Sequence, residues 1–401
     1  MESSPCRRVG PVAVHAPASA VTDRKVELDW LRLGIIVAVF LFHTTRFFDP
    51  EGWHVKNATV HPWLMVPIAI FTTWAMPLLF VISGAGACLS LRSRGAGRYV
   101  RERVLRLFVP LAVGAFTHVA WQVYLERVSH GQFQGSFLEF FPHYFEGLYG
   151  YGGNFAYQGL HLWYLEMLFV FSLAFLPLFL WCNTGAGRRG LHGLAAMLSR
   201  RGGPLLLAVP IALALALPDS GGFWGGRWWG AWNVPGHACF FAAGFLLASS
   251  DEVYQSVRRQ YRAAMILAFA VGTPLGAIFI GAPEPTHGSL RSWVFLSAFA
   301  LVAWSAILAI LGGAIDGLRA VRTPFLARAS ELVLPFYVLH QTVILTVGYP
   351  VIRWPLPDVV KWAITALASL LLTAGLCALV RSFKWLRVLF GMKARTAQPA
   401  W

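Results

Sequence analysis

The sequence predicts an all-α protein, a polytopic membrane helical bundle with about ten transmembrane helices. Of its 401 residues, 57% are hydrophobic and only 13% are charged, and the mean hydropathy is +0.59. A soluble chain of this length does not normally carry so much apolar surface. Stretches long enough to cross a hydrocarbon core of about 30 Å, roughly 20 residues each as helix, recur along the chain. They lie at about 29–48, 64–90, 104–125, 160–181, 204–218, 232–249, 263–281, 291–312, 331–351 and 359–380.

The distribution of basic residues predicts that the N-terminus and the C-terminus are both cytoplasmic. Lys and Arg concentrate in the cytoplasmic loops of membrane proteins. With the N-terminus inside, the inner segments hold 25 of the 33 basic residues and the outer segments hold 7, while Arg32 lies within the first span. We therefore expect a cytoplasmic tail over 1–28, a transmembrane domain over 29–381 and a cytoplasmic tail over 382–401, in the inner (cytoplasmic) membrane.

The composition also argues against nucleic acid, disulfide bonds and a bound metal. The formal net charge of +15 follows mostly from topology, because the basic residues are scattered between apolar runs and form no single patch for nucleic acid. The five cysteines are far apart and lack the spacing of a metal site, so we expect neither a disulfide framework nor a metal. The first 28 residues hold no apolar core before a cleavage site, so the first span is expected to be an uncleaved anchor.

The first span holds the densest set of ionisable residues. Such side chains cost at least about 2.5 kcal/mol each in hydrocarbon, so they point to function. Asp29 and Arg32 are three residues apart and can pair on one helix face. His43 follows Arg32 by eleven residues, within roughly 20° of the same face and about 16 Å further along. This arrangement suits an anionic ligand that enters from the cytoplasm. The alternative is that Arg32 snorkels to the inner headgroups and His43 only bonds a neighbouring helix.

Later spans contain further candidates. In the fourth span, His161, Trp163 and Glu166 lie at a depth comparable with that of His43. Glu166 could orient an imidazole or raise its basicity, and the alternative is a structural pair that locks two helices. The ninth span carries Tyr337 and His340. A single histidine within a span more often bridges two helices than acts in catalysis.

Arginines enter the third span where a phosphate pocket could form. Arg103 and Arg106 follow Ser83 and Gly84, which end an apolar run in the second span. Arginine forks bind phosphates well, yet a positive-inside loop alone would supply the same residues. Arg106 is least easily explained by topology, because it lies about one turn into the apolar run.

An outside loop is rich in aromatic residues. Trp and Tyr at this depth usually form an interfacial belt, and the alternative is stacking against a sugar acceptor. The aromatic residues of this loop are Phe223, Trp224, Trp228, Trp229 and Trp232.

In order and approximate spacing, several of these elements resemble the acyltransferase 3 family of integral membrane O-acyltransferases. The run Glu27-Leu-Asp-Trp-Leu-Arg32 with His43 looks like the family's first-span motif, in which the arginine and the histidine are regarded as essential. The resemblance covers roughly residues 24–380, and the 47–57 stretch is more similar to the branch of periplasmic glucan succinyltransferases. The segments similar to later signatures are Phe80-Val-Ile-Ser83-Gly84, Arg103-Val-Leu-Arg106-Leu-Phe-Val-Pro110, His161-Leu-Trp163-Tyr-Leu and Tyr337-Val-Leu-His340-Gln341.

The resemblance implies transfer of an acyl group, acetyl or succinyl, from cytoplasmic acyl-CoA to a hydroxyl of an extracytoplasmic or lipid-linked carbohydrate. No permanently bound cofactor is expected. The implied catalytic residues are His43 as general base, Arg32 on the CoA phosphates and Glu166 as an orienting partner. The implied substrate-binding residues are Asp29, Ser83, Gly84, Arg103, Arg106, His161, Trp163, Tyr337 and His340. The main alternative is a proton-coupled secondary transporter of a small anionic or sugar-like solute, which the lack of evident inverted repeats and broken helices disfavours.

Overall fold

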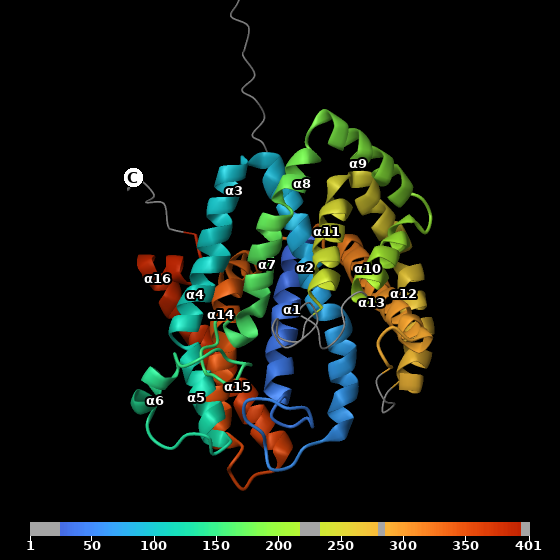
Figure 1. Ribbon diagram of the computed structural model, residues 1–401. Helices are drawn as coiled ribbons and strands as arrows, with labels where there is room; N and C mark the ends of the chain where they lie inside the picture. The colour runs from blue at the N-terminus through green and yellow to red at the C-terminus, as the bar shows by residue number, and fades with distance from the viewer. Residues whose placement is uncertain (1–24, 217–232, 280–284, 394–401) are drawn as a thin grey trace, which may run out of the picture.

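The computed structural model describes residues 25–216, 233–279 and 285–393, which are predominantly helical (Figure 1). The helices of the first half are α1 (Val26–Thr45), α2 (Met65–Ser93), α3 (Ala96–Arg103), α4 (Val109–Phe116), α5 (Val119–Ser129), α6 (Phe137–His143), α7 (Trp163–Ala174), α8 (Leu176–Trp181) and α9 (Gly185–Leu198). Those of the second half are α10 (Ala208–Ala216), α11 (Val234–Ser249), α12 (Asp251–Phe279), α13 (Leu290–Gly317), α14 (Pro324–Val351), α15 (Asp358–Ser382) and α16 (Lys384–Leu389).

Most of the predicted N-terminal tail, the end of the predicted C-terminal tail and the aromatic residues of the outside loop are not described. Residues 1–24 and 394–401 lie outside the described residues, as do Phe223, Trp224, Trp228, Trp229 and Trp232.

Helix covers each predicted apolar segment, but the number of candidate spans is smaller than ten. Among the described residues, five helical stretches are long and apolar enough to cross a membrane, and the number rises to seven if each of two bent pairs is one span. An all-helical membrane protein is therefore confirmed, while ten spans and two cytoplasmic termini stay predictions. The five stretches are Pro62–Ser93, Asp251–Ile278, Leu290–Gly317, Pro324–Val351 and Asp358–Ser382.

The two bent pairs have local causes in the sequence. Ala96–Phe116 and Val119–Ser129 meet at 40°, where Thr117 leaves the helical region with φ −126° and ψ −96°. Gly185–Leu198 and Gly203–Ala216 meet at 116°. At this second bend Gly202 adopts φ +77°, a conformation that glycine tolerates without a Cβ penalty, and a proline begins the next turn.

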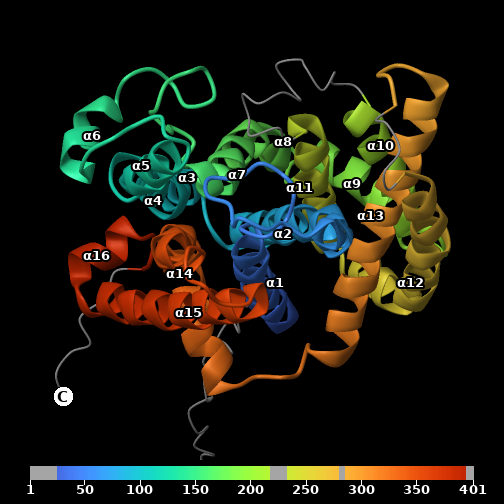
Figure 2. The same ribbon diagram turned by 90° about the horizontal axis from the view of Figure 1, so that it is seen from below.

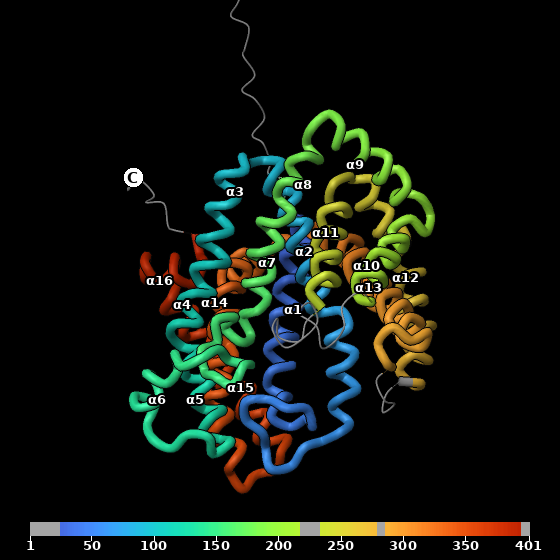
Figure 3. The backbone as a smooth tube through the Cα atoms, viewed as in Figure 1, coloured from blue at the N-terminus to red at the C-terminus, as the bar shows by residue number. Residues whose placement is uncertain are grey.

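Helix α1 lies in the interior of the bundle, where it packs against α2, α13, α14 and α15. Viewed along the bundle, α14, α15 and α16 lie on one side of α1, while α12 and α13 lie on the other (Figure 2). The segment between α1 and α2 turns back beneath the C-terminal end of α1 (Figure 3). The candidate residues of α1 therefore face neighbouring helices along much of its length.

Two glycines allow α2 and α11 to touch through their backbones. A Cβ on Gly84 would lie 1.9 Å from the carbonyl oxygen of Phe241, and a Cβ on Gly244 would lie 1.9 Å from that of Val81. No side chain fits at either distance, so both positions require glycine for packing. Gly84 was predicted to bind substrate, but the contact between α2 and α11 is sufficient to require a glycine at this position.

Candidate functional site

A cavity of about 580 Å³ lies beside the N-terminal part of α1, between α2, α3, α7 and α14. Its walls hold six basic and two acidic residues, a formal excess of four positive charges. An anionic ligand would therefore be favoured over a cationic one. The charged residues are Lys25, Arg32, Arg92, Arg94, Arg103, Arg106, Asp29 and Glu102.

Half of the basic side chains in this cavity have acidic partners. Arg32 Nη1 lies 3.6 Å from Asp29 Oδ1, as their spacing predicted, Lys25 Nζ lies 3.6 Å from Asp251 Oδ1, and Arg94 pairs with Glu102.

Arg92, Arg103 and Arg106 lack such partners within the described part of the chain, but Arg92 donates a hydrogen bond to the backbone carbonyl of Ser249. The guanidinium of Arg103 lies 4.7 Å from the ring centroid of Tyr99, and its Nε is buried without a hydrogen-bond partner. Arg106 lies in the π-helical turn η2 (Val104–Phe108), and π-helical turns occur frequently at functional sites. Two guanidinium groups that form no ion pair therefore face the same cavity.

The position of Arg32 depends on a small residue of α2. A Cβ on Gly86 would lie 3.3 Å from Arg32 Nη2, a tight contact, so the glycine leaves room for the guanidinium. Gly86 and Arg32 both line the cavity.

The part of the cavity nearer His43 is apolar with a few hydroxyl groups. Ser83 Oγ and Tyr164 Oη form a hydrogen bond of 2.6 Å, and Tyr337 Oη donates to the backbone carbonyl of His161. Among the residues of α1 that line the cavity, Arg32 is the last charged one, and only the apolar Ile36 follows it. This region suits an uncharged portion of a ligand.

Three histidines gather next to the cavity. The ring centroid of His340 lies 5.2 Å from that of His43 and 5.2 Å from that of His161. His340 Nδ1 donates to the carbonyl oxygen of Tyr337 at 2.7 Å, so Nε2 carries the lone pair. His340 Nε2 and His43 Nδ1 are both buried without a partner among the described residues. Two imidazole nitrogens are thus available for proton transfer.

The cavity and the three histidines adjoin across Tyr337. Tyr337 lines the cavity, and its ring centroid lies 5.7 Å from that of His340 and 6.0 Å from that of His161. On α1 the cavity reaches Ile36, and His43 lies seven residues further, about 10 Å by helical rise. His43 therefore does not line the cavity itself.

The structure brings together most of the predicted site residues. Asp29, Arg32, Ser83, Arg103, Arg106 and Tyr337 line the cavity, and His43, His161 and His340 form the adjoining cluster.

Three predicted residues lie elsewhere. Gly84 is at the contact of α2 and α11. Trp163 packs with its ring centroid 6.0 Å from Phe80 and 5.5 Å from His237. Glu166 makes no contact with the three histidines in the part of the chain described, and its Oε2 is buried without a partner. The role of Glu166 as an orienting carboxylate stays a prediction without geometric support.

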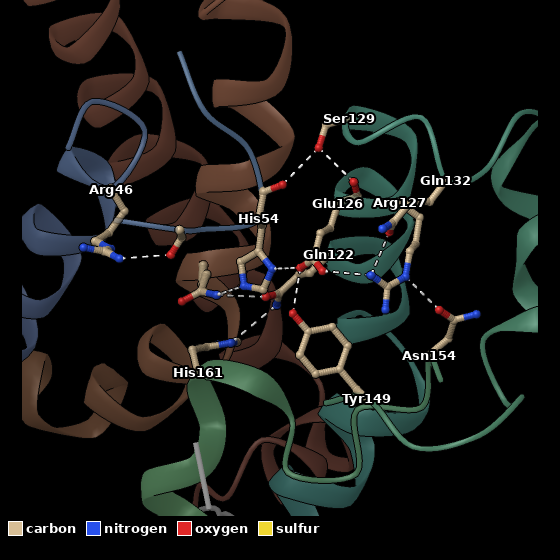
Figure 4. A network of polar contacts seen from close by, with 12 residues as sticks. Arg46, His54, Gln122, Glu126, Arg127, Ser129, Gln132, Tyr149, Asn154 and His161 are labelled. Atoms are coloured by element: carbon tan, nitrogen blue, oxygen red, sulfur yellow. Dashed lines mark hydrogen bonds and ion pairs between the residues drawn. The ribbon is translucent and has the colours of Figure 1, made fainter. Parts of the chain in front are cut away.

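A different carboxylate pairs with a histidine nearby. Glu126 of α5 accepts a hydrogen bond from His54, in the segment between α1 and α2 (Figure 4). This pair was not predictable from the sequence, because the two residues are 72 positions apart and one lies in a loop. The one available signal was an ionisable residue directly after an apolar run, at Glu126.

The loop that carries His54 is rich in charged contacts. Arg46 Nη1 lies 3.1 Å from Asp49 Oδ2, and Lys56 Nζ donates to the carbonyl oxygen of Arg46 at 2.6 Å. Burial lowers the pKa of the Lys56 amine, and the Asp49 carboxylate opposes that shift. The loop is therefore held in one conformation over the end of α1.

The described helices are those of a membrane protein, and the charge of the cavity would favour an anionic ligand. The sequence profile of the acyltransferase 3 family, described as an acyltransferase domain, matches residues 25–381, a range that includes the cavity and the histidines. The chain belongs to this family and is a membrane acyltransferase. No curated protein and no solved structure matches it significantly.

Proposed function

We propose that the protein transfers an acyl group from cytoplasmic acyl-CoA to a hydroxyl of an extracytoplasmic or lipid-linked carbohydrate. One observation carries the proposal: a cavity with guanidinium groups that form no ion pair adjoins a cluster of three histidines. A phosphate-bearing donor matches the first feature, and proton transfer at a reacting hydroxyl matches the second.

The phosphates of CoA would bind in the charged part of the cavity. Arg103 and Arg106 supply guanidinium groups without acidic partners, and Arg32 supplies a third beside Asp29. Arginine forks hold phosphate oxygens with two parallel hydrogen bonds, which fixes position as well as charge. The thioester end would then extend along α1 toward Tyr337.

The reaction would take place at His43. The acceptor oxygen attacks the thioester carbonyl carbon, a C–O bond forms and the C–S bond breaks. His43 takes the hydroxyl proton and gives it to the departing thiolate, so the products are an ester and free CoA. Tyr337 lines the cavity and lies beside His340 and His161, so the acyl end would pass Tyr337 to reach His43.

The proposed topology has ten spans with both termini in the cytoplasm. The proposed location is the inner membrane. Placing 25 of the 33 basic residues inside supports this orientation. The arginines of the cavity then face the compartment that holds acyl-CoA. A glucan is the proposed acceptor, on the resemblance of the 47–57 stretch alone.

A transporter is the competing function for buried arginines and histidines. The structure has two bent helix pairs, so the argument that a transporter should contain broken helices no longer counts against a transporter. Membership of the acyltransferase family favours the enzyme. Purified protein in detergent decides between them, because no gradient exists there. We expect labelled acetyl-CoA or succinyl-CoA to acylate an extracted cell-envelope glycan fraction and to release free CoA.

A substitution at His43 tests the proposed chemistry in the same assay. General bases contribute about 10² to 10⁴ in rate, so His43→Ala should lose most turnover. His237→Gln is the matched control, because His237 is also buried but packs against Phe80, away from the cluster. Parental turnover in His43→Ala would contradict the assignment.

A further inference from the structure

A buried imidazole and carboxylate lie beside the three histidines. His54 and Glu126 are only 8% and 7% exposed, and His54 Nδ1 donates to Glu126 Oε2 (Figure 4). Burying two ionisable groups is costly unless each is paired and hydrogen-bonded. We call this pair the dyad.

Further donors hold the carboxylate of the dyad. Tyr149 Oη donates to Glu126 Oε2 at 2.8 Å, and Arg127 Nη1 donates to Oε1 at 3.2 Å (Figure 4). An ionised carboxylate only accepts hydrogen bonds, so it holds the proton of His54 on Nδ1. Glu126 thereby sets both the orientation and the tautomer of His54, as the carboxylate partners of functional histidines do.

The opposite edge of the His54 ring connects to α14. Gln341 Nε2 donates to His54 Nε2 at 3.2 Å and to Gln122 Oε1 at 3.1 Å. Gln122 Nε2 in turn donates to His161 Nδ1 at 3.4 Å. Because Gln341 directly follows His340 on α14, the dyad is connected to two of the three histidines of the cluster.

The backbone beside the dyad reaches the third histidine. The indole of Trp53 stacks on the ring of His43, with centroids 6.3 Å apart and planes at 18°. Ser129 Oγ donates to the carbonyl oxygen of His54 at 3.0 Å, so the residue is fixed at its side chain and at its backbone. The position of Trp53 over His43 therefore depends on His54.

Anchoring of the loop does not by itself explain the dyad. The same loop is already tied to α15, where Asn57 Nδ2 donates to Asp358 Oδ1 at 3.0 Å and Lys361 Nζ donates to Asn57 Oδ1 at 3.1 Å. A second anchor made of buried ionisable groups adds cost where a neutral contact would serve.

We infer that His54, oriented by Glu126, is a positioning residue for the acyl-transfer step. His54 lies on the side of the histidines away from the donor cavity. It fixes Trp53, which stacks on His43, and Gln341, which follows His340 on α14. The inference rests on the proposed acyl transfer and adds to it a pair of residues that touch neither CoA nor the phosphate-binding arginines.

Kinetics of His54→Gln and Glu126→Gln test this inference. Misplacing a reacting group by about 1 Å can cost 10²-fold in rate, so we expect kcat to fall by roughly that factor. The KM for acyl-CoA should stay within about twofold, because no residue of the dyad lines the cavity. The double variant should be no slower than the slower single variant, since residues that act as one unit are not additive.

Two further variants separate positioning from loop anchoring and from misfolding. Asn57→Ala loosens the same loop at its other anchor, and we expect a lower unfolding temperature with kcat within about twofold of the parent. Tyr149→Phe removes a single donor to Glu126 and should lower kcat several-fold. If His54→Gln no longer binds CoA and is therefore misfolded, Tyr149→Phe decides the question.

The outcomes distinguish this inference from the proposed function. Parental kcat in His54→Gln and Glu126→Gln, or an equal loss of kcat in Asn57→Ala, would overturn the inference and leave acyl transfer intact. Absence of transfer in the parent protein would overturn the proposed function and the inference with it.

Discussion

Neutralising the two unpaired arginines should weaken donor binding more than any other change in the cavity. Arg103→Gln/Arg106→Gln keeps most of the side-chain volume and the capacity to donate hydrogen bonds but removes both charges. Hydrogen bonds to charged groups are worth about 1.5–3 kcal/mol each. Loss of one such interaction raises the Kd for CoA roughly 10- to 100-fold, and the double variant should exceed the effect of either single one.

The assay is equilibrium binding of CoA to the purified protein in detergent, at low and at high salt. Arg98→Gln is the control, because it removes a positive charge from α3, the helix of Arg103, at a side chain that is 71% exposed and does not line the cavity. We expect the control to change the Kd by less than about twofold. An unchanged Kd in the double variant, or an equal change in Arg98→Gln, would refute the placement of the phosphates.

Three further predictions follow from the geometry. Gly84→Leu should lower the unfolding temperature sharply by overpacking α2 against α11, while Gly97→Ala, in open space, should not; equal temperatures would contradict the close contact. Gly86→Val should raise the KM for acyl-CoA by crowding Arg32, with kcat at saturation unchanged; a normal KM would count against that role of Arg32. Glu166→Gln should keep kcat within about twofold, and a tenfold loss would restore its orienting role.

The helices of the apolar segments were predictable from the sequence, because about 20 consecutive apolar residues indicate a spanning helix. Helices α3, α6, α9 and α16 lie outside those segments and were not predicted. The shared face of Arg32 and His43 was predictable, since a regular helix fixes the angle between residues eleven apart. The number of spans was less accessible. The 116° bend after α9 depends on a positive φ at Gly202, and a hydropathy pattern carries no information about that angle.

The partners of the site residues depend on tertiary packing that no local pattern encodes. Glu166 is close to His161 in sequence, yet the carboxylate that meets an imidazole is Glu126, which reaches a loop histidine 72 residues away. Gly84 belongs to a segment that resembles a family signature, which predicts a substrate-binding role, but only the distance to α11 shows that packing requires a glycine there.

The proposed acyl transfer is tested most directly by a structure of the protein bound to a non-transferable acyl-CoA analogue. We expect the phosphates between Arg32, Arg103 and Arg106, and the carbon that replaces the thioester carbonyl about 3–3.5 Å from a hydroxyl oxygen hydrogen-bonded to His43. Phosphates bound outside the cavity, or an acyl end directed away from His43, would contradict it.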